Sequence, residues 1–149
     1  MGITTGGIFG LQFEKALKKT QAGDIESTSV YVAMIKETAT PDFDTMDFWD
    51  PDLSTDEVTA GSGYTAGGKA LDATPALTIA ANVLKYDAAD VVWATSTIAD
   101  AQAAVGYFTT GTTTTDEMYW LSDFTATAAT ANGTFTIEWH TDGIFTLSY

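Results

Sequence analysis

The chain has 149 residues, 45% of them hydrophobic and 12% aromatic, which suffices for one domain with its own core and excludes a disordered chain. Its formal net charge is −14, with six lysines and no arginine, so its field would repel nucleic acids, anionic membranes and nucleotide substrates. Cysteine is absent and histidine occurs once, which excludes a disulfide framework, a thiolate nucleophile and a Cys-based zinc site.

We expect two parts, an N-terminal arm with a short helix in residues 1–23 and a β domain in residues 24–149. The opening residues are rich in glycine and threonine and lack the basic and apolar regions of a signal peptide. The sequence therefore predicts synthesis in the cytoplasm without a secretion signal, and it contains no apolar run long enough to span a membrane.

A helix is predicted from Leu11 to about Thr20. Phe13, Ala16 and Leu17 recur at helical spacing and form its apolar face, and charged side chains fill the other face. Lysines near the C-terminal end suit the helix dipole, and Gly23 follows as a stop signal.

From Asp24 onward the hydrophobic period changes to two. A central strand is expected at Ser29–Ile35, then a long acidic connection at Thr40–Glu57 and a strand with a glycine bend at Gly61–Leu71. Leu77–Ile79 and Val83–Tyr86 flank a turn at Ala81 and Asn82, which predicts a hairpin.

Further strands are expected at 91–94, 98–108 and 118–121, with a turn at Asp87–Asp90 and a threonine-rich turn at Thr109–Thr115. Gly133–His140 alternates apolar and polar residues, and Asp142-Gly143 predicts a type I′ turn to a return strand at 144–147. The chain is therefore predicted to be all-β, an antiparallel β-sandwich or jelly-roll-like barrel of about 8–9 strands with one short N-terminal helix.

Few residues offer chemistry. His140 lies on the polar face of a predicted strand near a turn, where we interpret it as an exposed strand residue. The acidic connection offers oxygen ligands that suit Ca²⁺, but its spacing does not fit an EF-hand, so a solvated loop is favoured and a cation site is the alternative. Its carboxylates are Asp42, Asp44, Asp47, Asp50, Asp52, Asp56 and Glu57. A pair of them would also meet the minimum requirement for glycoside hydrolysis, which needs two carboxyl groups.

Two other features have ordinary structural explanations. Gly61–Gly68 lacks the lysine and following helix of a phosphate-binding loop, so its glycines are expected to allow tight bends. The tryptophans have sizes that suit stacking on sugars, but core packing is favoured for those on strands; they are Trp49, Trp93, Trp120 and Trp139. We therefore predict no catalytic, cofactor-binding or metal-binding residue, and no enzyme activity.

Three segments, 57–71, 87–93 and 132–145, resemble a family of small virion structural proteins of tailed bacteriophages. The similarity covers most of the chain in the same order. It departs from the family at 98–101, where members often carry a basic residue, and at 109–115, where members tend to be shorter. The family includes capsid decoration, head-fibre and minor tail proteins.

The resemblance implies a component of the virion. Within it we expect a capsid decoration (cement) protein on the outer surface of a phage head, a homotrimer whose partner is the major capsid protein, because the body is all-β, charged residues are few, and an N-terminal arm and helix could lie along a neighbour. The alternative is a head-fibre or minor tail component that contacts the host, with the acidic loop and the threonine-rich turn at its tip. A small hydrolase is a third hypothesis. The candidate contact residues are Ile3, Ile8, Phe9, Leu11 and Phe13, and the alternative is that this segment packs on the chain's own β domain.

Overall fold

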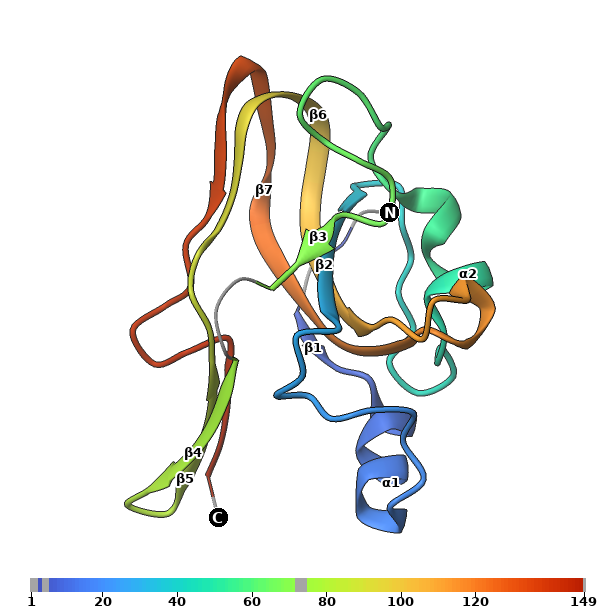
Figure 1. The fold of residues 1–149 in the computed structure, drawn as a ribbon, viewed down its shortest axis with the longest axis vertical. Helices are drawn as coiled ribbons and strands as arrows, with labels where there is room; N and C mark the ends of the chain where they lie inside the picture. Colours follow the sequence, from blue (N-terminus) through green and yellow to red (C-terminus); the bar gives the residue numbers. More distant parts are fainter. Residues whose placement is uncertain (1–2, 4–5, 72–74, 149) are drawn as a thin grey trace.

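The computed structural model describes residues 3, 6–71 and 75–148. Its strands form two antiparallel sheets, one of five strands in the order β1-β7-β6-β2-β3 and one of three in the order β4-β5-β8. The all-β fold with a short N-terminal helix is thus confirmed (Figure 1). The elements are β1 Gly7–Ile8, α1 Gly10–Lys18, β2 Val30–Lys36, α2 Trp49–Asp52, η1 Ser54–Asp56, β3 Lys69–Ala70, β4 Ala76–Ala80, β5 Val83–Asp87, β6 Val91–Phe108, η2 Thr113–Thr115, β7 Glu117–Ile137 and β8 Phe145–Ser148.

The two longest strands, β6 and β7, pair along almost their whole length. The sequence predicted several short strands here, and the structure joins them, because bulges take the place of turns. The register shifts at five points, and positive φ angles occur close to these shifts at Thr95, Asp100, Thr125 and Asn132. Such bulges bend and twist a strand pair, so β6 and β7 curl over at one end of the molecule (Figure 1).

The five-stranded sheet carries a hydrophobic core on each face. Alternate residues of β2 point to opposite faces: Val30, Val32 and Met34 enter one core, and Ala33 and Ile35 enter the other. The first core reaches the small sheet through Tyr86 and Phe145. The central strand predicted at Ser29–Ile35 is therefore buried on both faces.

The second core is closed by the acidic connection and the N-terminal segment. Trp49 stacks on Tyr107 with 5.2 Å between ring centroids and an interplanar angle of 3°, and Leu53 is fully buried beside it. Phe9 is also fully buried and packs on Phe43 of the same connection. A long loop of this kind is stabilised by the apolar side chains that it contributes to the core.

The predicted hairpin at β4 and β5 is confirmed, with positive φ at Ala81 and Asn82 as a type I′ turn requires. The predicted C-terminal hairpin is wrong, since β8 pairs with β5 and β7 ends at Ile137 paired with β6. In the turn from His140 to Gly143 only Gly143 has a positive φ, so a type I′ turn does not form. Phe145 instead stacks on Tyr86, with 5.2 Å between ring centroids.

Candidate functional site

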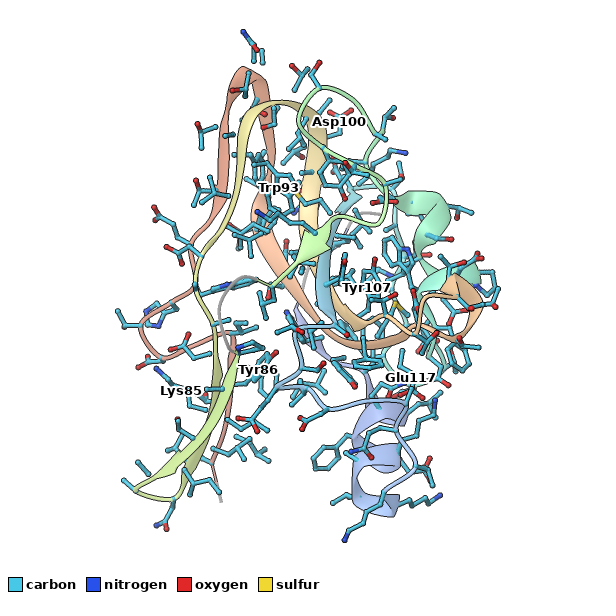
Figure 2. All side chains as sticks on the ribbon, in the orientation of Figure 1. Lys85, Tyr86, Trp93, Asp100, Tyr107 and Glu117 are labelled. Carbon is cyan, nitrogen blue, oxygen red and sulfur yellow. The ribbon has the colours of Figure 1, made fainter. Side chains whose placement is uncertain are left out.

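Helix α1 is held to the body by a polar cluster. The Lys15 ammonium lies 2.7 Å from the Asp47 carboxylate and 2.7 Å from the Glu117 carboxylate. Gln12 donates a second hydrogen bond to Asp47, and the other oxygen of Glu117 accepts from the Ala22 N–H at 2.6 Å. Figure 2 shows Glu117 at the end of α1 nearest the body. The helix is therefore fixed by charge and hydrogen bonds.

This attachment reverses the expected orientation of the helix. The sequence assigned Phe13, Ala16 and Leu17 to its apolar face, which a surface helix ordinarily turns toward the core. In the structure Gln12 is the buried residue of α1, whereas the Phe13 side chain is 49% exposed and Leu17 is 73% exposed. The apolar face of α1 is therefore left largely exposed and is not packed into either core.

A groove of about 280 Å³ separates α1 from the small sheet. Phe13 and Ala16 line it on the helix side, and Leu77, Leu84 and Leu147 line it on the sheet side. Its remaining lining residues are Ile8, Gln12, Gln21, Gly23, Asp24, Ile25, Tyr119 and Phe145. The helix and the small sheet extend from the same end of the molecule and flank this groove (Figure 1).

The sheet side of the groove continues into an exposed apolar row. Ile79 pairs with Leu84, and Leu84 pairs with Leu147, so the three side chains lie on one face across β4, β5 and β8. Ile79 is 68% exposed and Leu147 is 44% exposed. Four of the five large apolar side chains that are markedly exposed among the described residues thus lie on α1 or the small sheet.

Charges near the groove are few. Burial lowers the pKa of Lys15, but its hydrogen bonds to Asp47 and Glu117 outweigh that effect and leave the pKa above its ordinary value. Among the described residues that line the groove, Asp24 is the one that carries a carboxylate. On the exposed side of α1, Glu14 and Lys18 form an ion pair one helical turn apart.

The five candidate contact residues differ in how far they are buried. Ile3 and Phe9 are buried within the chain, and β1 pairs with β7 through Gly7 and Ile8. Ile8 and Leu11 are half-buried, and Phe13 alone of the five is largely exposed. Leu17, which the sequence placed on the helix but not among the contacts, is the more exposed neighbour of Phe13 at i+4.

The acidic connection uses its carboxylates to organise its own backbone. Asp42 accepts hydrogen bonds from the Asp44 and Thr45 N–H groups, which lower the pKa of its carboxyl group. Asp52 accepts from the Asp47 and Phe48 N–H groups at 2.8 and 3.0 Å. Within the part of the chain that the structure describes, no cluster of three or more acidic, histidine or cysteine side chains is arranged to hold a metal ion.

The other residues considered from the sequence have structural settings. Trp49, Trp93 and Trp120 are buried in the cores, and Trp139 is half-buried. His140 is exposed, with 3.2 Å between its Nδ1 atom and the Asp142 carboxylate. In the glycine-rich segment, Gly68 has a φ of 70° and lies against the backbone of Val32, where a Cβ would collide with the Val32 carbonyl.

No protein-family model, curated protein or solved structure matches the chain. In residues 3, 6–71 and 75–148 no helix has the length and apolarity needed to cross a membrane. The fold and the site define a small antiparallel β protein with an apolar groove. Such a groove provides apolar contact area for a partner's side chains, with little charge to be desolvated on binding.

Proposed function

We propose that the protein is a structural component of a tailed-phage virion, a capsid decoration protein that binds the outside of the head. The observation that carries the proposal is the outward apolar face of α1 beside the groove. Exposed apolar surface of this kind marks interaction sites in monomeric domains. The resemblance noted in the sequence supplies the class of partner, the major capsid protein.

The polar attachment of α1 supports a binding role. A helix held by Lys15, Asp47 and Glu117 keeps its geometry while Phe13 and Leu17 stay available to a partner. Preorganised apolar side chains of this kind lower the entropy lost on association. The low content of charged residues, 17% of the chain, favours burial of the surrounding surface in an assembly.

Reconstitution on heads that lack the protein tests this role. We expect Leu17→Lys to weaken binding to heads by about tenfold or more, since a charge would replace an exposed apolar side chain of the proposed contact surface. Val92→Lys is the matched control, because Val92 is 41% exposed on β6 away from the groove. Equal binding by both variants would refute the docking role of α1. A point substitution is preferable to truncating the arm, because Phe9 and β1 belong to the folded body.

A head-fibre or minor tail component is the second candidate. One contact favours it: the Thr113 hydroxyl donates to the Asp50 carboxylate at 3.2 Å, so the threonine-rich turn and the acidic connection meet and form one surface. Densitometry of purified particles separates the two roles. A copy number comparable with that of the major capsid protein indicates decoration, and a small fraction of it indicates a fibre or tail.

A further inference from the structure

Strand β4 forms one edge of the small sheet, and its own side chains offer little protection against pairing with another strand. Its five residues, Ala76–Ala80, include no charged residue and no proline, and Ile79 is 68% exposed. Exposed edges are usually guarded by lysine, proline, bulges or a covering segment, because their free N–H and C=O groups accept another strand. The outer edge of β4 is thus suited to strand pairing.

The hydrogen-bonding direction of each residue of β4 follows from two observations. The Leu77 N–H donates to the Glu26 carboxylate at 2.9 Å, so it points away from β5. Because these directions alternate along a strand, the Ile79 N–H points outward as well, and Thr78 faces β5. The two-residue turn at Ala81 and Asn82 leads to the same assignment. Such a turn closes on a hydrogen-bonded pair, here Ala80 and Val83, so Ala80 and Thr78 bond to β5 and Ile79 points outward.

The sequence of β4 is self-complementary. Written from either end, Ala-Leu-Thr-Ile-Ala places alanine opposite alanine, an aliphatic residue opposite an aliphatic residue, and Thr78 opposite itself. We propose that β4 pairs in antiparallel fashion with β4 of a second copy of this chain, about a two-fold axis at Thr78. Leu77 of one copy and Ile79 of the other then exchange their outward N–H and C=O groups, twice by symmetry.

Charge favours this edge over other surfaces for self-contact. Two chains with a net charge of −14 repel, so their contact is least costly along a strand that has no charged residue of its own, and Glu26 is the carboxylate that must move aside there. The nearest charged groups on β5, Lys85 and Asp87, neutralise each other at 2.8 Å. The pairing extends the row of Ile79, Leu84 and Leu147 into a second copy and makes one six-stranded sheet.

Glu26 acts as a partial guard of this edge. Its carboxylate occupies the Leu77 N–H that the second copy needs, and pairing transfers that N–H to the carbonyl of Ile79 in the other chain. A five-residue strand contact is smaller than a standard stable interface, so the dimer is reversible and depends on concentration. The inference does not rest on the virion role, and it gives a two-fold dimer where the sequence analysis expected a homotrimer.

Cysteine cross-linking tests the register, because the natural chain has no cysteine. The pairing makes Thr78 a non-hydrogen-bonded pair with itself, with Cα atoms about 4.5 Å apart, a separation that a disulfide spans. We expect Thr78→Cys to form a disulfide dimer under mild oxidation. Ala80→Cys is the matched control, since it lies opposite Ala76 and roughly 14 Å along the strand from its own copy. Equal cross-linking of the two variants, or none at Thr78→Cys, would overturn the register.

Sedimentation equilibrium tests the pairing without cross-links. We expect the wild type to approach twice its 15.8 kDa mass as concentration rises. Ile79→Pro removes an outward N–H without breaking a β4–β5 hydrogen bond and should abolish the dimer, whereas Ile79→Thr keeps the N–H and should retain it. Glu26→Ala frees the Leu77 N–H and should tighten the dimer severalfold. A wild type and Glu26→Ala that both stay monomeric, or an Ile79→Pro dimer as strong as the wild type, would refute the proposal.

Discussion

The indole ring of Trp120 on β7 lies against the α-carbon of Gly106, its cross-strand partner on β6. A Cβ at position 106 would collide with the ring, and Trp120 is almost fully buried between Tyr86 and Phe145. The first core therefore depends on the absence of a side chain at one position.

The first prediction concerns this contact. Gly106→Ala should lower the free energy of unfolding by about 3 kcal/mol, the upper end for overpacking, because Trp120 has no free space to enter. Gly133→Ala on the facing strand is the control, since the nearest atom to its Cβ would be 4.0 Å away. Urea denaturation measures both. Equal stability of the two variants would show that the core relaxes around Trp120.

The polar attachment of α1 provides the second prediction. Lys15→Met leaves Asp47 and Glu117 facing each other without a cation, and we expect a loss of about 2 kcal/mol, moderated by the water that still reaches the pair. The pKa of Lys15 is higher in the folded state than in the unfolded state. Its contribution to the free energy of unfolding is therefore complete at pH values below the unfolded-state pKa, and it is lost as the pH rises through the folded-state pKa. The difference in the free energy of unfolding between the wild type and Lys15→Met should therefore disappear in strong alkali. Lys18→Met, an exposed change on the same helix, should not reproduce this pattern.

The third prediction concerns Glu57, whose carboxylate accepts hydrogen bonds from the Tyr64 hydroxyl and the Gly67 N–H, each at 2.7 Å. Burial raises the pKa of Glu57 despite these bonds. The folded state therefore holds this proton more tightly, and the free energy of unfolding falls as pH rises from about 4.3 through the folded pKa. Glu57→Gln keeps an acceptor oxygen but carries no charge. Its free energy of unfolding should therefore rise relative to that of the wild type as the pH is raised from acidic to neutral.

Denaturation at several pH values measures this difference. Glu37→Gln is the control for loss of one negative charge, because Glu37 is exposed on the loop after β2. A constant offset between Glu57→Gln and the wild type at all pH values would contradict the prediction.

The reversed orientation of α1 leads to the fourth prediction. Leu17→Gln should change the free energy of unfolding by less than about 0.5 kcal/mol, because the side chain is 73% exposed. Phe9→Ala, one residue before the helix, should cost about 3–5 kcal/mol, because Phe9 is fully buried. Thermal denaturation distinguishes them, and a large loss for Leu17→Gln would mean that α1 packs through its apolar face.

Local patterns in the sequence predicted the elements whose determinants are local. The β4–β5 hairpin follows from two short apolar runs around Ala81 and Asn82, and the alternation of Phe135 and Ile137 correctly predicted their burial. The bends of β6 and β7 were not predicted, because left-handed conformations at Thr95 and Thr125 occur at residues that carry no turn signal. A continuous bulged strand and two strands with a turn have similar local sequences.

The candidate site was harder to predict from the sequence than the local elements of the fold. Helical spacing located Phe13 and Leu17 on one face but did not show that this face is solvent-exposed. That outcome is decided by Asp47 and Glu117, which lie 32 and 102 residues from Lys15 in the chain. The C-terminal hairpin was wrong for the same reason, since the position of Phe145 is set by Tyr86 on a distant strand.

The attachment of α1 to Glu117 has a mechanical consequence. Glu117 is the first residue of β7, and β7 is paired with β6 from this point to Ile137. A load on α1 is therefore passed through the Lys15–Glu117 ion pair into the β6–β7 pair, whose residues enter both cores.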